Sequence, residues 1–290
     1  MAALVYATRK MQEIEMHNII RPDAYAMIIG AMKCGTTSLY DYLQGHPEIC
    51  PSITKEPEFF SENQGHGSNV KDYNDLFSFD ASTHKYALEA STGYTKYPME
   101  PRVPENIFNY GINPKFIYLI RNPFDRITSH FNYMQKNASW LLDIDDSHII
   151  STCNYFQQLE KYRQFFPAES ILILDFDGLK NNPALVLKQV YEFLNISSSY
   201  FPETYEIANV TQPESKFVRS LNRSKIAHLS KYVPKSLRQF GKTILQKVSP
   251  PSKRILTNKE KELIYNSLKE DMCSLHRVYG FNVSKWGFGS

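Results

Sequence analysis

The chain has 290 residues, which suits one large domain or two small ones. Hydrophobic residues make up 42% and charged residues 22%, as in ordinary globular proteins, and the 12 Gly, 16 Pro and 4 Cys exclude a disordered chain, collagen and a disulfide-rich scaffold. The net charge of +3 hides an asymmetry: residues 216–254 hold 11 Lys or Arg and no acidic residue, while the remainder carries 22 basic and 30 acidic residues.

Residues 1–25 are expected to form a polar lead-in with room for one short helix. The first strand is predicted directly after it. Residues 26–29 are continuously apolar and end at Gly30, a pattern typical of a buried strand. Residues 36–43 open with hydroxyl side chains that can cap a helix. Residues 45–57 are so rich in breaking residues that we expect a loop.

Strands and helical patterns alternate along the rest of the chain. We expect strands at 86–90, 116–120 and 171–176, and helices at 124–133, 183–194 and 259–279. Several strands are apolar throughout, which favours a parallel sheet flanked by helices and therefore an α/β fold. We expect a single domain at residues 26–290, within which the basic, proline-containing stretch 197–256 forms a mobile segment.

The sequence contains no pattern that predicts export or membrane insertion. Cys34, Cys50, Cys153 and Cys273 are far apart and lack metal-site spacing, so we expect four reduced thiols. No apolar run approaches the ~20 residues that span a bilayer, and residues 1–7 lack the positive region that starts a signal peptide. We therefore expect a cytoplasmic protein with no membrane partner, and with no nucleic-acid partner because no such binding motif accompanies the basic stretch.

The segment GAMKCGTTS links the first predicted strand to the first predicted helix. Successive backbone N–H groups and a helix N-terminus create a positive hollow for an anion, and Gly30 and Gly35 allow close approach of the backbone. Nucleoside triphosphate loops follow G-x-x-x-x-G-K-[ST], but here Thr36 replaces the lysine, which has moved to Lys33. This difference argues against an ordinary ATPase or GTPase.

A second anion site is predicted where the strand at 116–120 ends. Arg121 lies at the carboxyl end of that strand, where ligands of α/β proteins bind, and Ser129 follows in the next helix. An arginine can bind a phosphate through two hydrogen bonds, and a serine hydroxyl can complete the site. A nucleoside with phosphates at both ends would satisfy Lys33 and Arg121 together. For Arg126 we expect a structural role, in which it braces the helix against an acidic neighbour.

These two motifs, in this order and separation, resemble those of sulfotransferases that use 3′-phosphoadenosine 5′-phosphosulfate (PAPS). GAMKCGTTSLYDYL is similar to the family's 5′-phosphosulfate loop, and IYLIRNPFDRITSHF is similar to its 3′-phosphate motif. Residues 54–60 resemble the KEPxFF element of the heparan-sulfate and bacterial branch. Residues 89–94 resemble its E-x-[ST]-P-x-Y segment. The resemblance spans about residues 26–287.

The resemblance implies a P-loop-kinase-like sulfotransferase fold with a five-stranded parallel sheet. It implies PAPS as donor, adenosine 3′,5′-bisphosphate (PAP) as product and no metal requirement. Lys33 would stabilise charge on the leaving phosphate, and Arg121 and Ser129 would hold the 3′-phosphate. The predicted loop contacts of the 5′-phosphate are Cys34, Gly35, Thr36, Thr37 and Ser38. Lys216 and Arg219, in the basic stretch, are further candidates for contact with the donor.

The resemblance also implies that Glu56 is the general base, because the KEPxFF branch uses the carboxylate of this element. A partly desolvated carboxylate can take a proton from a hydroxyl group. Lys55 would contact the sulfuryl group or the acceptor. His46, His66 and His130 are rival bases, since the cytosolic branch of the family uses a histidine.

The acceptor is predicted from the charges near the base, where Glu58, Glu62, Asp143, Asp145 and Asp146 suggest an acidic surface. Such a surface disfavours a polysulfated glycan and favours a neutral or cationic small molecule with a hydroxyl or N–H group. We expect a natural-product tailoring enzyme, with guanidinium alkaloids such as saxitoxins as one acceptor class. Glycan, glycolipid and protein tyrosine acceptors stay open.

Two other functions also stay open. The first is a small-molecule kinase with a variant phosphate loop, which requires magnesium ligands; Asp175, at the end of a strand, is one carboxylate among many. The second is a sulfotransferase fold that binds anions without turnover. The joint presence of Lys33, Glu56, Arg121 and Ser129 argues against this second function.

Overall fold

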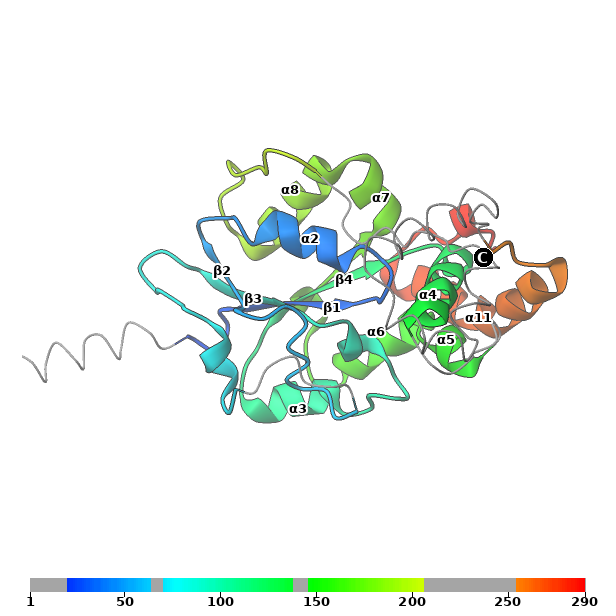
Figure 1. The fold of residues 1–290 in the computed structure, drawn as a ribbon, viewed down its shortest axis with the longest axis horizontal. Helices are drawn as coiled ribbons and strands as arrows, with labels where there is room; N and C mark the ends of the chain where they lie inside the picture. The colour runs from blue at the N-terminus through cyan, green and yellow to red at the C-terminus, as the bar shows by residue number, and fades with distance from the viewer. Residues whose placement is uncertain (1–19, 64–69, 138–145, 206–253, 290) are drawn as a thin grey trace, which may run out of the picture.

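Five parallel strands form the centre of the structure, a computed structural model that describes residues 20–63, 70–137, 146–205 and 254–289. The strands lie in the order β2-β3-β1-β4-β5. Their bounds are β1 Tyr25–Gly30, β2 Ile49–Pro51, β3 Tyr86–Ala90, β4 Lys115–Ile120 and β5 Ile171–Asp175. The predicted α/β fold, a parallel sheet flanked by helices, is confirmed (Figure 1).

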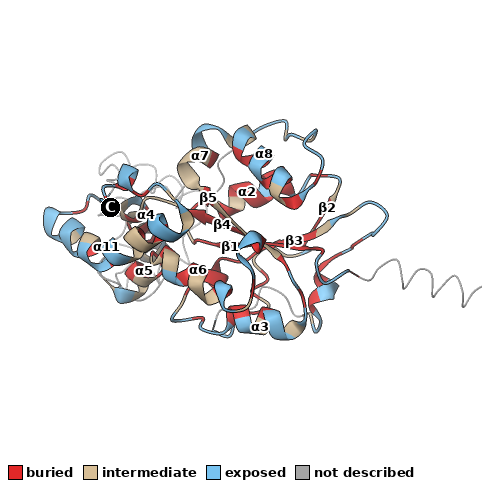
Figure 2. Ribbon diagram, turned by 180° about the vertical axis from the view of Figure 1, so that it is seen from behind, coloured by how far each residue is buried: buried red, intermediate tan, exposed pale blue. Residues whose placement is uncertain are grey.

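The helices form a layer on each face of the sheet and a third group beyond the carboxyl ends of the strands (Figures 1 and 2). One face carries α2 (Thr36–Leu43), α7 (Phe176–Asn181) and α8 (Pro183–Leu194), and the other carries α3 (Val103–Tyr110) and α6 (Tyr155–Arg163). Beyond the strands lie α4 (Pro123–Asn137), α5 (Ser147–Ser151) and α11 (Asn258–Tyr279). Short 3-10 helices are η1 (Tyr73–Leu76), η2 (Thr92–Thr95), η3 (Ala168–Ser170) and η5 (Ser284–Trp286).

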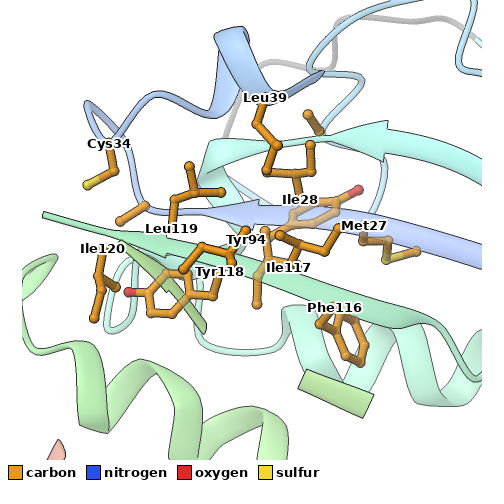
Figure 3. Packing of buried hydrophobic residues seen from close by; sticks show 14 of the residues in the cluster. Met27, Ile28, Cys34, Leu39, Tyr94, Phe116, Ile117, Tyr118, Leu119 and Ile120 are labelled. Atoms are coloured by element: carbon orange, nitrogen blue, oxygen red, sulfur yellow. The ribbon is translucent and has the colours of Figure 1, made fainter. Parts of the chain in front are cut away.

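The packing of the core explains why β1 carries no charged residue. All six residues of β1 are buried, because helices cover both faces of the sheet. On β4, Phe116 packs against Tyr162 of α6 with ring centres 4.9 Å apart. Leu39 of α2 lies on the opposite side of the sheet (Figure 3). Among the described helices, none combines the length and the hydropathy that a bilayer span needs.

The prediction of a loop at residues 45–57 is wrong, because these residues include β2. This strand has three residues and lies at the edge of the sheet, where β3 is its one partner among the described strands. An edge strand leaves one row of its backbone groups unpaired, so it tolerates a proline such as Pro51. The sequence patterns also miss α3, α5, α6 and α7, and the strand expected at 171–176 ends at Asp175, because Phe176 begins α7.

Candidate active site

The loop between β1 and α2 follows a path that side chains at its two glycines would block. Gly30 has φ +143°, and a Cβ there would lie 2.0 Å from the Thr95 hydroxyl oxygen. Gly35 has φ +89°, and a Cβ there would lie 2.8 Å from the Phe176 ring. The glycines therefore let the loop pack closely against both neighbours while its backbone stays available to a ligand.

The first turn of α2 presents backbone N–H groups at the carboxyl edge of the sheet. No described side chain caps this turn, and the turn contains no acidic residue, so it keeps the partial positive charge of a helix N-terminus. Cys34 has a buried thiol, and its N–H donates to the Ala31 carbonyl at 3.1 Å. Thr36 and Ser38 are buried, and Thr37 is half-buried. Within this loop, the backbone N–H groups of the first turn therefore suit a phosphate better than the buried side chains of Cys34, Thr36 and Ser38 do.

The two predicted anion motifs meet at this edge. Arg121 Nη1 donates to the carbonyl oxygen of Lys33 at 3.3 Å, although 88 positions separate the two residues. The Arg121 guanidinium lies 4.6 Å from the centre of the Phe176 ring. Its Nε is buried and has no partner in the described part of the chain, and its ion pair with the exposed Asp125 spans 4.0 Å. An unsatisfied cationic donor beside Lys33 fits a site that an anionic ligand completes.

Lys33 lies among other cations. Burial lowers the pKa of Lys33, and the positive charges of Arg121 and Arg126 lower it further, while the Glu56 carboxylate opposes the shift. The Lys33 ammonium lies 4.6 Å from the centre of the Tyr133 ring on α4, a contact that the sequence patterns did not predict. A group of cations with low solvent exposure attracts anions to this edge of the sheet.

Arg126 is wholly buried, and the prediction of an acidic neighbour for it is wrong. Its Nε donates to the carbonyl of Met32 at 3.1 Å, and its Nη1 donates to the carbonyl of Ile149 at 2.8 Å. Within residues that the structure describes, no carboxylate pairs with this guanidinium. Arg126 therefore ties the loop between β1 and α2 to α5 and adds a positive charge near Lys33.

Of the other residues predicted to contact the donor or the sulfuryl group, the structure describes Ser129 and Lys55. Ser129 is half-buried on α4, which begins two residues after Arg121. Lys55 is half-buried in the loop after β2, and burial lowers the pKa of its ammonium group. Lys216 and Arg219 lie outside the described residues, so contact of these two residues with the donor stays a prediction.

Glu56 lies on a loop that crosses the carboxyl end of β3. Its N–H donates to the Ala90 carbonyl at 3.1 Å, and its backbone has φ +52°. The side chain is half-buried, and its negative charge acts on both Lys33 and Lys55 by raising their pKa values against the effect of burial. The structure therefore places the predicted base close to the predicted catalytic lysine, as transfer to a hydroxyl group requires.

The two predicted rival histidines that the structure describes are poorly suited to act as the base. His46 is 1% exposed, and both of its ring nitrogens have backbone partners, the Ser197 carbonyl at 2.8 Å and the Glu48 N–H at 3.0 Å. His130 is also 1% exposed, and burial lowers the pKa of its ring, which keeps it neutral. His66 lies outside the described residues.

The acidic residues from which we predict a cationic acceptor have other partners in the structure. Glu58 is buried and hydrogen-bonded within its own loop region. Glu62 forms an ion pair with Arg102, and Asp146 caps α5. The remaining two aspartates of that set lie outside the described residues. The described carboxylates therefore do not form an acidic acceptor surface.

A fully buried carboxyl group lies behind the Glu56 loop. Glu89, in β3, accepts hydrogen bonds from the hydroxyl groups of Tyr73 and Ser91, each at 2.9 Å. Burial raises the pKa of Glu89 from 4.5 to about 7, although hydrogen bonds from Tyr94, Ser91 and Tyr73 oppose this shift. The folded protein therefore binds the Glu89 proton more tightly than the unfolded chain does.

This proton binding predicts a pH dependence of stability. Because the pKa of Glu89 is raised on folding, its contribution to stability is full below pH 4.5 and is lost as the pH rises through about 7. The Glu89→Gln variant cannot ionise at this position. As the pH rises from about 5 to about 8, the free energy of unfolding of the wild type should fall, because Glu89 ionises. The variant should fall by a smaller amount, and we expect the difference between the two to be about 2 kcal/mol. Urea unfolding at both pH values measures this difference, and equal falls in the two proteins would contradict the prediction.

The comparisons with known proteins agree with this geometry. The family model of the sulfotransferase domain matches residues 23–240, which include both anion motifs. The chain belongs to the sulfotransferase domain family. A crystal structure of a sulfotransferase from Alicyclobacillus acidocaldarius shares the fold, with a TM-score of 0.63 and 19% identity over 93% of this chain and 100% of that one. The predicted family and the predicted sulfotransferase fold are confirmed.

Two curated relatives come from the heparan-sulfate branch. Heparan sulfate glucosamine 3-O-sulfotransferase 5 from Homo sapiens is 25% identical over 202 residues, which cover 64% of this chain and 57% of that protein. The bifunctional heparan sulfate N-deacetylase/N-sulfotransferase 3 from Mus musculus is 26% identical over 199 residues, which cover 60% of this chain and 22% of that protein. This sulfotransferase-family chain thus spans little more than half of the first relative and about a fifth of the second.

Proposed function

We propose that this sulfotransferase-family protein transfers the sulfuryl group of PAPS to a hydroxyl or N–H group and releases PAP. The observation that carries the proposal is the meeting of Lys33, Arg121 and Glu56 at one edge of the sheet. The two cations suit the phosphates of the donor, and the carboxylate suits the proton of the acceptor. Membership of the family supports the same reaction.

The residues divide the chemistry between them. When bound, the donor supplies a sulfuryl group joined to its 5′-phosphate through a bridging oxygen. Lys33 would neutralise the charge that develops on this oxygen as the S–O bond breaks, while Glu56 accepts the proton of the attacking group. The first-turn amides of α2 would hold the 5′-phosphate, and Arg121 with Ser129 would hold the 3′-phosphate. Catalysis of this kind depends mainly on positioning and on charge stabilisation.

For the acceptor we propose a small molecule that carries a hydroxyl or N–H group. A glucosamine-containing oligosaccharide should be tested, because the name of a curated relative specifies heparan sulfate glucosamine. A guanidinium alkaloid should be tested beside it, since that is an acceptor class expected from the sequence. Water can serve as the acceptor until the natural one is known. In that assay the S–O bond of PAPS breaks, water provides the new oxygen, and the release of PAP and sulfate gives the rate.

The first test is a calorimetric titration of PAP without magnesium, beside ATP with magnesium and adenosine 5′-monophosphate. We expect PAP to bind most tightly of the three. Preference for ATP with magnesium, or failure to bind PAP, would overturn the proposal in favour of a kinase. The structure already gives Asp175 other partners, since it caps α7 through the Asp177 N–H at 3.2 Å and forms an ion pair with Lys285.

The Arg121→Ala variant tests the assignment of the 3′-phosphate. We expect its affinity for PAP to fall by about 10–100-fold, because a charge-assisted phosphate contact is lost. Adenosine 5′-monophosphate lacks the 3′-phosphate, so its affinity should change little. Calorimetry with both ligands makes this comparison, and an equal loss for the two would show that Arg121 does not contact the 3′-phosphate.

A further inference from the structure

The loop that carries Glu56 has a backbone that residues other than glycine rarely adopt. Glu56 has φ +52° and Glu58 has φ +51°, both in the left-handed region. Such a backbone persists only where surrounding groups determine it strongly, and it is common at functional sites. Several of the groups that hold this turn come from one segment, residues 89–94, at the carboxyl end of β3.

Three hydrogen bonds join the turn to that segment. The Glu56 N–H donates to the Ala90 carbonyl at 3.1 Å, and the Glu58 N–H donates to the Ser91 hydroxyl at 3.0 Å. The Gly93 N–H donates to Glu58 Oε1 at 2.8 Å. Glu58 is therefore bound through both its backbone and its side chain, whereas these bonds hold Glu56 through its backbone alone.

The Glu58 carboxylate is built into the protein. It is 5% exposed, and its second oxygen, Oε2, accepts a hydrogen bond from the Ser61 hydroxyl at 2.6 Å. The Ser91 hydroxyl, which accepts from the Glu58 N–H, donates in turn to Glu89 Oε2 at 2.9 Å. A continuous set of buried bonds thus runs from β3 into the Glu56 loop, and such a network fixes the loop rather than leaving it to solvent.

The bond between Glu58 and Gly93 joins two positions that the shared patterns leave variable. Glu58 occupies the variable position of the KEPxFF element, and Gly93 occupies the variable position before the tyrosine of the E-x-[ST]-P-x-Y segment. The side chain at position 58 and the backbone N–H at position 93 therefore meet beside the predicted base.

We propose that Glu58 is a positioning residue for Glu56: its buried carboxylate, held by the Gly93 N–H and the Ser61 hydroxyl, fixes the left-handed turn that keeps Glu56 beside Lys33. This inference rests on the proposed function of Glu56 as general base. Glu58 itself does not touch the reacting groups, and its effect reaches the reaction through the placement of its neighbour. A small displacement of a reacting group lowers the reaction rate strongly, so we expect a large effect on the rate.

The test compares Glu58→Ala with Glu58→Gln in the full chain. In Glu58→Ala, we expect PAP release from PAPS, with water as acceptor, to slow by about 10–100-fold. The calorimetric affinity for PAP should stay unchanged, and hydrogen exchange at the Gly93 amide should become faster. The Glu58→Gln variant keeps a carbonyl oxygen for the Gly93 N–H, so it should restore most of the rate and the protection of that amide. A role in general stability alone would instead lower PAP affinity and rate together.

The Glu56→Gln variant separates this inference from the proposed function. If Glu56→Gln keeps the wild-type rate, the assignment of the base fails and the positioning role fails with it. If Glu56→Gln loses the rate while Glu58→Ala keeps it, the base stands and the positioning role alone is overturned. If Glu58→Ala does not fold, Ser91→Ala serves as the second variant, because it removes only one bond to the turn. We then expect a smaller loss of rate in Ser91→Ala, with unchanged affinity for PAP. An unchanged rate in Ser91→Ala would also overturn the positioning role.

Discussion

Replacing Lys33 with alanine is expected to slow PAP release from PAPS by about 10²–10³-fold. Lys33 lies at the carboxyl edge of the sheet with Arg121 bonded to its carbonyl, so its ammonium is the cation proposed for the bridging oxygen. The charge on that oxygen develops only as the S–O bond breaks, so the rate should suffer more than the affinity for PAP. Steady-state rates with water as acceptor, together with calorimetry, compare the two effects.

Lys85→Ala is a matched control for this variant, because it removes the same side chain at the opposite edge of the sheet. Lys85 precedes β3 and pairs with Glu48 at 2.6 Å. We expect its rate and its PAP affinity to equal those of the wild type. If Lys33→Ala loses only PAP affinity and keeps its maximal rate, Lys33 holds the donor without stabilising the leaving group, and its proposed catalytic role is wrong.

Glu56→Gln is expected to lower the same rate by about 10²–10³-fold, because an amide of equal size cannot accept the proton of the attacking group. The loop should keep its shape, since Glu56 is held through its backbone N–H at 3.1 Å from the Ala90 carbonyl. PAP affinity should therefore change little. The measurement is PAP release, first with water and then with any acceptor found in the screen.

Glu192→Gln makes the same isosteric change on the exposed face of α8, where Glu192 pairs with Lys188 at 3.9 Å. This control should keep the wild-type rate. A Glu56→Gln variant that retains full activity would contradict the assignment of the base. Of the rival bases, the two that the structure describes, His46 and His130, offer no ready replacement, because each is 1% exposed.

Much of the fold follows from local sequence signals. The bounds predicted for the helices at 36–43 and 183–194 and for the strand at 86–90 match the structure. The signal of the helix at 183–194 is present in the structure, where the Asn182 side chain accepts from the Leu185 N–H and Pro183 begins the helix. The hydroxyl side chains expected to cap the helix at 36–43 do not do so, because Gly35 occupies its N-cap. The strand β2 and the helix α6 were missed because contacts with distant segments stabilise them. For α6, the Asp271 carboxylate of α11 accepts the N–H groups at its start.

The candidate site divides in the same way. The sequence by itself determined the two candidate anion motifs, because each is a local strand-to-helix connection whose residue types suit a phosphate. Only the tertiary structure decided that Arg121 bonds to Lys33, that Phe176 and Tyr133 flank them, and that Glu58 is buried. The physical reason is that parallel strands bring the ends of distant segments to one edge, and the solvent exposure of a charged side chain depends on what packs over it there.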